Sequence, residues 1–285
     1  MPIALTRALR VTGHRSTLAA ALPMPLMLSL MLLAGPQQHV PSPSAAYPYA
    51  SRGRVTYTAH RGGSLEVPEN SMSGWTAAYR RGTAQLLDAD LRVLRDGTLV
   101  VMHDPTLDRT TNAHGPVDRL TLEQWRTVLL TPSRKLPGHW RPEHPPTLGQ
   151  ILRRFGGRTA MVLEIKDPRG LPRLSAALHG HRLTDSVYVQ SRSVRVAARA
   201  HRMGLLSSVW RGPSKIRRSH PERWVGRVDM LSVDYRARAR DVRKAVRSGI
   251  PHVWSHTVDT RAARDRMLRL GVTGIITDAP GRLTR

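Results

Sequence analysis

Two histidines stand out in the amino-acid sequence because each one ends a short apolar run. His60 follows the run 55–59, His103 follows the run 99–102, and a charged residue comes directly after each histidine. Imidazole is the side chain whose ordinary pKa lies nearest neutral pH, so these two histidines are candidates for a general acid and a general base. The sequence therefore predicts proton-transfer chemistry where the two runs end.

Three carboxylates accompany the histidines. Asp88 and Asp90 are two residues apart, so on a strand both side chains point the same way. Crowded carboxylates repel each other unless a cation lies between them, which makes the pair a natural site for a hard divalent ion. Glu164 ends another apolar run and can supply a third oxygen ligand. The alternative is a set of exposed acids that are neutralised by the many arginines of the chain.

Two basic side chains are candidates for holding a phosphate or another oxyanion. Arg61 offers a planar fork of donors, and Lys166 offers a compact charge. A salt bridge between Lys166 and Glu164, on one face of the same strand, is the alternative for the lysine, and both roles are compatible.

The elements that must position these side chains alternate along the chain from Val55 onwards. Short β-rich runs alternate with helical patterns, which is typical of a parallel α/β fold. We expect strands at 55–59, 86–90, 99–102, 160–165, 186–190, 206–210, 229–234, 252–257 and 274–277. We expect helices from Asn70 or Ser71 to about Arg81, from Leu122 after a Thr121 cap, from Thr147 to Phe155 and from Arg261 to Leu270, and a proline-rich loop at 131–146.

Nine strands are one too many for an eight-stranded barrel, and the third run explains the difference. No crossover helix fits between Asp90 and Leu99, but Asp96-Gly97 suits a two-residue hairpin turn. With that loop, Asp90 would lie opposite His103. The remaining eight strands, in residues 55–285, predict a (β/α)₈ TIM barrel with a β-hairpin extension after the second strand and an active site at the carboxyl ends of the strands.

The first 46 residues have the form of a secretory signal peptide. Three arginines precede the apolar stretch 18–34, and Ser44-Ala45-Ala46 is a candidate cleavage sequence. Two prolines interrupt the apolar stretch, so an uncleaved membrane anchor is the weaker alternative. We therefore expect a secreted or cell-surface protein with a signal at 1–46 and a linker at 47–54, and membrane contact only through an uncleaved N-terminal segment.

Composition narrows the classes of function. The 285 residues contain no cysteine, which excludes disulfides, Cys-ligated zinc and thiol catalysis. The formal net charge is +25, and only four of the 45 basic residues are lysine, so 41 are arginine. A coding sequence rich in G and C would give this bias, while selected binding of polyanions is the alternative. We expect no specific nucleic-acid partner.

A series of short motifs in register is similar to the glycerophosphodiester phosphodiesterase family. The matching segments cover nearly all of 56–285 and are His60-Arg61-Gly62, Pro68-Glu69-Asn70-Ser71, Asp88-Ala89-Asp90-Leu91, Asp96-Gly97, Val100-Val101-Met102-His103-Asp104, Leu107-Asp108-Arg109-Thr110-Thr111-Asn112, Pro146-Thr147-Leu148, Leu163-Glu164-Ile165-Lys166 and the run from Gly271 to Pro280.

The resemblance implies a phospholipase-C-like barrel that hydrolyses glycerophosphodiesters to glycerol 3-phosphate and an alcohol. It implies that His60 and His103 are the catalytic pair and that one divalent cation, Ca²⁺ or Mg²⁺, is the cofactor. The implied ligands of the cation are Asp88, Asp90 and Glu164, and the implied phosphate contacts are Arg61 and Lys166. The expected substrate is a small glycerophosphodiester or a glycerophosphate polymer, and the expected state is a monomer.

Three positions depart from the family pattern. Asp88 stands where the family usually has Glu. His256 replaces a tryptophan of the substrate pocket, and Trp254, two residues earlier on the same face, is a candidate substitute, so both are predicted to bind substrate. Arg192 replaces the aromatic residue after Ser191. These changes predict a more polar and more cationic active-site mouth.

Two other functions are compatible with the same motifs. A phospholipase D acting on lysolipids or sphingolipids would use a related barrel, although polar His256 and Arg192 do not favour a pocket for a lipid tail. A catalytically inactive barrel that binds polyanions is the other alternative. An acid, a base and a metal site together are more than binding alone needs, which favours the enzyme.

Overall fold

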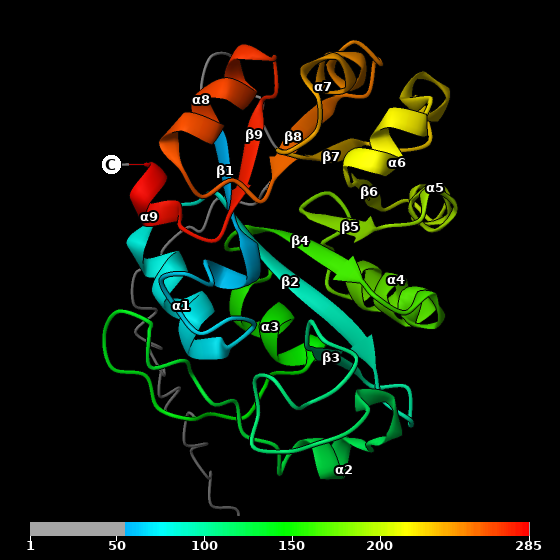
Figure 1. Ribbon diagram of the computed structural model, residues 1–285. Helices are drawn as coiled ribbons and strands as arrows, with labels where there is room; N and C mark the ends of the chain where they lie inside the picture. The colour runs from blue at the N-terminus through cyan, green and yellow to red at the C-terminus, as the bar shows by residue number, and fades with distance from the viewer. Residues whose placement is uncertain (1–54, 285) are drawn as a thin grey trace, which may run out of the picture. The chain divides into compact units, whose positions relative to one another are not determined.

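Eight parallel strands close into a barrel in the computed structural model, which describes residues 55–284 (Figure 1). The predicted TIM barrel is confirmed, while the predicted signal at 1–46 and the linker at 47–54 lie outside the described residues. The parallel strands are β1 (Thr56–Ala59), β2 (Leu86–Val93), β4 (Ala160–Ile165), β5 (Val187–Ser191), β6 (Leu206–Arg211), β7 (Met230–Asp234), β8 (His252–His256) and β9 (Gly274–Thr277). Pairing of β1 with both β9 and β2 closes the barrel.

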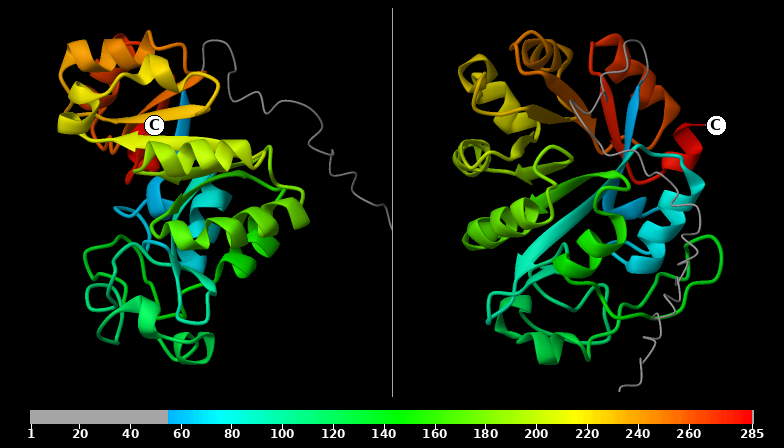
Figure 2. Two further views of the ribbon diagram at one scale, coloured as in Figure 1. Left: turned by 90° about the vertical axis from the view of Figure 1, so that its right-hand side faces the viewer. Right: turned by 180° about the vertical axis from the view of Figure 1, so that it is seen from behind.

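Helices cover the outside of the barrel (Figure 2). They are α1 (Met72–Arg81), α3 (Leu148–Phe155), α4 (Leu171–Gly180), α5 (Val194–Arg202), α6 (Pro213–Arg218), α7 (Ala239–Val246) and α8 (Arg261–Arg269), with short helices α2 (Leu122–Trp125) and α9 (Pro280–Leu283). Between residues 55 and 284, no helix is long and apolar enough to cross a membrane.

The helix starts follow from their caps, as the sequence predicts. The Ser71 hydroxyl accepts the Gly74 N–H at the start of α1. Thr121 and Thr147 each form a capping box with the glutamine three residues later, at the starts of α2 and α3. Such side chains satisfy backbone donors that the first helical turn leaves unpaired.

The antiparallel hairpin of β2 with β3 (Leu99–Val101) is confirmed, but its predicted register is wrong by one residue. Leu91 pairs with Val101. The Met102 N–H therefore donates to the Asp90 carbonyl, at 2.9 Å, and His103 does not lie opposite Asp90. His103 instead follows the paired segment, where the chain leaves the sheet.

The loop of the hairpin explains the shift in register. The Gly97 N–H donates to the Leu94 carbonyl, and the Leu94 N–H donates to the Thr98 carbonyl. The loop thus holds three residues and not two, and within it only Gly97 has a positive φ, of 83°. The Asp96 carboxylate accepts the Thr98 N–H at 2.9 Å. A three-residue loop that ends in a left-handed glycine is the next commonest hairpin loop after the two-residue type.

An excursion of the chain, residues 102–147, lies between β3 and α3 and carries its own small apolar core. Trp125, Leu107 and Met102 are fully buried members of that core. Its helix α2 lies near the hairpin (Figure 1), whereas its later loop reaches Pro137, which lines a pocket together with Arg261 of α8. The excursion adds a side wall beside the carboxyl end of β2.

The barrel interior and the layer between strands and helices form separate apolar clusters. The interior cluster consists of Leu86, Ala160, Val162, Tyr188, Met230, Trp254 and Ile276. Side chains alternate along each strand, so the next inward residues toward the carboxyl ends are polar. They include Asp88, Asp90, Glu164 and His256, which lie where active sites form in this architecture.

Candidate active site

The turn after β1 places His60 and Arg61 over the barrel. Arg61, Gly62 and Gly63 have φ values of 52°, 93° and 99°, so three successive residues are left-handed. Glycine adopts this conformation without steric cost, and a Cβ on Gly63 would also lie 3.0 Å from the Pro280 ring. The tight turn directs the Arg61 N–H to the Asp88 carboxylate, at 3.1 Å.

His60 is held by a carboxylate from the neighbouring strand end. Its Nδ1 lies 2.7 Å from Oδ1 of Asp278, directly after β9, and the Ser64 hydroxyl donates to the same oxygen. The Asp278 N–H in turn donates to Asp259, at 2.8 Å. Burial disfavours the charged imidazole, but Asp278 and Asp88 outweigh it and raise the pKa of His60. The result is a buried His–Asp pair at the mouth of the barrel.

His103 has a carboxylate partner of its own. Its Nδ1 lies 2.6 Å from Oδ1 of Asp104, and Arg92 donates from Nε and Nη2 to the His103 carbonyl, at 3.0 and 2.6 Å. Arg109 contacts Asp104 and also binds Glu69 through two hydrogen bonds of 2.8 and 2.7 Å. Burial lowers the pKa of His103 despite the nearby carboxylates. The second histidine is therefore fixed at both backbone and ring.

Lys166 lies between two of the predicted metal ligands. Asp90 and Glu164 are register partners on β2 and β4, and Lys166 Nζ is 2.8 Å from an oxygen of each. Asp90 also accepts a hydrogen bond from Asn70 at 3.0 Å and pairs with Arg61 at 3.2 Å. Burial opposes the charge on Asp90, but Lys166 and Arg61 hold its pKa well below the usual range. The predicted Lys166–Glu164 salt bridge is thus present.

Asp88 is the least compensated carboxylate of the site. It is 1% exposed, and within residues 55–284 its one hydrogen bond comes from the Arg61 N–H. Burial raises its pKa to about 7, with Asp90 and Glu164 adding to the rise and His60 opposing it. A buried carboxylate of this kind is stabilised by any cation that reaches it.

A row of rings runs from His60 across the mouth. The His60 and His256 ring centroids are 4.6 Å apart, and those of His256 and Trp210 are 5.9 Å apart. Within the described part of the chain, His256 Nδ1 is buried without a hydrogen-bond partner, and burial together with His60 lowers the pKa of His256 well below its usual value. Trp254, which was predicted to bind substrate, lies one layer lower in the apolar barrel interior. The indole beside His256 at the mouth is that of Trp210.

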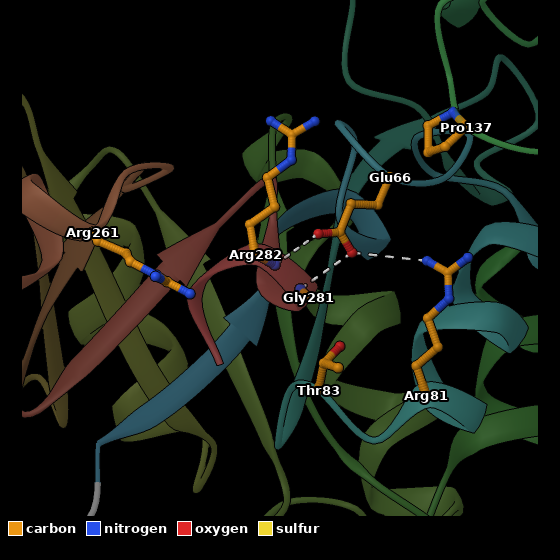
Figure 3. A pocket seen from close by; sticks show the side chains of 7 residues that line it. All are labelled: Glu66, Arg81, Thr83, Pro137, Arg261, Gly281 and Arg282. Atoms are coloured by element: carbon orange, nitrogen blue, oxygen red, sulfur yellow. Dashed lines mark hydrogen bonds and ion pairs between the residues drawn. The ribbon is translucent and has the colours of Figure 1, made fainter. Parts of the chain in front are cut away.

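A pocket of about 510 Å³ opens beside His103, Glu164 and Lys166. It is lined by Arg92, His103, Pro105, Glu164, Ile165, Lys166, Pro168, Ser191, Arg192 and Ser193. A larger pocket, of about 850 Å³, lies elsewhere and contains none of the predicted site residues (Figure 3). In that second pocket the Glu66 carboxylate accepts the N–H groups of Gly281 and Arg282, at 3.2 and 3.1 Å. The smaller pocket is therefore the candidate substrate site.

The structure brings together all predicted site residues except Trp254. The sequence predicted no role for Asp278, which is the partner of His60. Asp278 follows β9 directly, just as His60 follows β1. Its position at the end of a strand could therefore have identified it from the sequence. Glu69 and Arg109 carry no such signal because they lie in loops far apart in the sequence.

Comparisons with known proteins agree with this geometry. The model of the glycerophosphoryl diester phosphodiesterase family matches residues 60–282. A glycerophosphodiester phosphodiesterase of Bacillus subtilis (strain 168) is 30% identical over 251 residues, covering 81% of this chain and 85% of the relative. One of Caldanaerobacter subterraneus subsp. tengcongensis is 30% identical over 248 residues, covering 79% and 94%.

Solved structures share the fold. An Oleispira antarctica phosphodiesterase in complex with the product sn-glycerol-3-phosphate aligns with a TM-score of 0.69 and 19% identity, over 80% of this chain and 94% of that one. At this identity the likeness supports the barrel architecture alone.

Proposed function

Because the chain belongs to the glycerophosphoryl diester phosphodiesterase family, we propose that it hydrolyses glycerophosphodiesters to glycerol 3-phosphate and an alcohol with the help of one divalent cation. Family membership shows that it acts as a phosphodiesterase on glycerophosphodiesters. The identity of the products and the need for a cation are what we propose. The observation that carries the proposal is the pair of histidines, each with its own carboxylate, around one cluster of buried charges. The product bound to the Oleispira antarctica relative is the one proposed here.

His60 and His103 are the groups that move protons in this proposal. The nucleophile, either water or the glycerol hydroxyl of the substrate, must lose a proton, and the departing alkoxide must gain one. Since Nδ1 of each ring is bound to a carboxylate, Nε2 is the nitrogen left for the substrate. One histidine accepts the proton of the nucleophile, and the other protonates the leaving group.

Arg61 and Lys166 bind the phosphodiester anion in this proposal. Carboxylates hold both side chains. Arg61 contacts Glu69 at 3.3 Å and Asp90 at 3.2 Å, and Lys166 contacts Asp90 and Glu164, each at 2.8 Å. Fixed cations of this kind stabilise charge that grows on the phosphoryl oxygens and need no rearrangement during the reaction. His256, packed against His60, limits the space beside the scissile group.

Asp88, Asp90 and Glu164 would hold the divalent cation, Ca²⁺ or Mg²⁺. All three are buried oxygen donors, and within residues 55–284 Asp88 accepts a single hydrogen bond, so a cation would stabilise its charge. Among residues 55–284 no three His, Cys, Asp or Glu side chains are arranged as a ready metal site, and Lys166 Nζ contacts Asp90 and Glu164. When bound, the ion would offset negative charge on the phosphoryl oxygens.

Residues 1–46 support export as part of the proposal. Their basic start, apolar stretch and small-residue cleavage sequence fit a secretory signal, and an enzyme exported in this way would meet small glycerophosphodiesters or glycerophosphate polymers outside the cytoplasm. Fractionation of cells that express the full chain, with amino-terminal sequencing of the exported form, tests this. A start at Tyr47 is expected, and full-length protein retained in the cytoplasm would contradict export.

Product analysis tests the reaction. Protein stripped with a chelator is offered glycerophosphocholine, lysophosphatidylcholine or polyglycerophosphate, with Ca²⁺ or Mg²⁺ returned in turn. Phosphorus-containing products are identified by ³¹P NMR and choline by ¹H NMR. Glycerol 3-phosphate and choline are expected from glycerophosphocholine only with the cation. His60→Ala should abolish release, whereas His114→Ala, in an exposed His–Asp pair outside the site, should not. Undiminished release by His60→Ala, or none by the parent protein, would refute the assignment.

A further inference from the structure

Arg192 is a basic residue of the candidate substrate pocket that the reaction described above does not use. It follows Ser191, the last residue of β5, and is exposed. It lines the same 510 Å³ pocket as His103, Glu164 and Lys166. The residue therefore borders the same space as three of the candidate site residues.

The Arg192 side chain stands at the end of the row of rings that begins at His60. Its Cζ lies 5.0 Å from the Trp210 ring centroid, and Trp210 lies beside His256, which packs on His60. Stacking on an indole uses the face of a guanidinium and leaves its N–H edge available. Arg211 also donates to the Arg192 carbonyl, at 2.5 Å, which fixes the backbone. The Trp210 ring and the fixed backbone thus hold the Arg192 side chain in place.

The other cations of the pocket already have partners. Lys166 contacts Asp90 and Glu164, and Arg92 donates to the His103 carbonyl. Within residues 55–284, the Arg192 guanidinium makes no hydrogen bond and no ion pair, and Glu164 is the one carboxylate that lines the pocket. The pocket therefore holds one guanidinium that, among the described residues, no carboxylate neutralises.

Resting on the proposed function, we infer that Arg192 selects substrates whose alcohol carries a second phosphate group. The glycerol half is common to every glycerophosphodiester, so discrimination lies in the alcohol. A guanidinium binds phosphate through two parallel hydrogen bonds, and such charge-assisted bonds are about twice as strong as neutral ones. Arg192 is thus a specificity-determining residue for anionic alcohols.

A matched pair of substrates tests the inference. One is glycerophosphoglycerol, and the other is the same diester with a phosphate on its terminal hydroxyl. The parent enzyme is expected to show about tenfold higher kcat/KM for the phosphorylated member at low salt. Arg192→Gln should reduce the ratio of the two kcat/KM values to about one, and Arg192→Lys should leave an intermediate ratio because it keeps the charge but not the planar fork.

Two further arginine variants separate local binding from general charge effects. Arg158→Gln removes an exposed arginine just before β4, at the opposite end of the barrel, and Arg282→Gln removes one from the larger pocket of Figure 3. Both should keep the tenfold ratio. An unchanged ratio in Arg192→Gln, or an equal fall in either control, would overturn the inference. Absence of hydrolysis of both substrates by the parent enzyme would instead refute the proposed function.

Discussion

Each catalytic histidine candidate has its own carboxylate, and this pairing decides which ring nitrogen can react. Asp278 binds Nδ1 of His60 and Asp104 binds Nδ1 of His103, at 2.7 and 2.6 Å. A carboxylate on Nδ1 favours the tautomer with a proton there and leaves Nε2 for the substrate. Asp278 and Asp104 are positioning residues in this account, because they act through the histidines.

Replacement of Asp278 tests that role. In Asp278→Asn the amide N–H can donate to Nδ1 and favour the wrong tautomer of His60. Since general acid–base catalysis contributes roughly 10²–10⁴-fold, we expect kcat to fall by about 10²-fold or more with little change in KM. Steady-state kinetics with glycerophosphocholine over a range of pH gives both values and the shift in the pH profile.

The matched control is Asp108→Asn, which alters the exposed His114–Asp108 pair. It should leave kcat within about twofold of the parent. Thermal unfolding of both variants checks that Asp278→Asn remains folded, because Asp278 also accepts from Ser64. A folded Asp278→Asn protein with parental kcat would show that His60 needs no carboxylate.

At the scale of elements, the hairpin loop determines where His103 leaves the sheet. Gly97 has φ of 83°, a conformation that costs an L-residue roughly 1–2 kcal/mol. A Cβ there would also meet the flexible end of the Arg173 side chain, which can move. We expect Gly97→Ala to destabilise the protein by about 1 kcal/mol, as measured by urea unfolding.

Gly180→Ala is the control for the glycine substitution. Gly180 is the last residue of α4, has no positive φ and has nothing within 4 Å of an added Cβ. Alanine favours a helical conformation, so this variant should be as stable as the parent or slightly more stable. Equal stability of Gly97→Ala and Gly180→Ala would contradict the strain assigned to the loop.

Local signals predicted most of the fold, and tertiary contacts account for the rest. Caps such as Thr121 and Thr147 and the alternation of apolar runs located the helices and the barrel strands. The hairpin register failed because one extra loop residue shifts every pair, and Asp96-Gly97 fits both loop lengths. Strand-end position found the catalytic candidates. Trp210 also ends an expected strand, but its place beside His256 depends on how β6 and β8 pack across the barrel mouth, which position in the sequence does not show.

At the scale of the whole molecule, a bound cation should stabilise the barrel because its proposed ligands come from two strands. A ligand at 100 times its Kd stabilises a folded protein by about 2.7 kcal/mol. For a domain of this size each kcal/mol raises Tm by roughly 2–4 °C, so Ca²⁺ or Mg²⁺ should raise the Tm of stripped protein by about 5–10 °C. Differential scanning calorimetry measures the shift.

In this calorimetric experiment, NaCl at the same ionic strength replaces the divalent cation as a control, because any salt screens the net charge of +25. Asp90→Asn should remove the shift, whereas Asp265→Asn, which alters a partly exposed residue of α8, should keep it. A shift of equal size in Asp90→Asn would place the ion elsewhere.

The most direct test of the central claim compares His60→Ala and His103→Ala on two diesters that differ in leaving group. A p-nitrophenyl ester of glycerol 3-phosphate departs without protonation, whereas glycerophosphocholine needs a general acid. We expect both variants to lose about 10²-fold or more in kcat/KM on glycerophosphocholine. One of the two should recover most of this loss on the p-nitrophenyl ester. Equal losses of both variants on both esters, or full activity of either variant on glycerophosphocholine, would contradict an acid–base pair formed by His60 and His103.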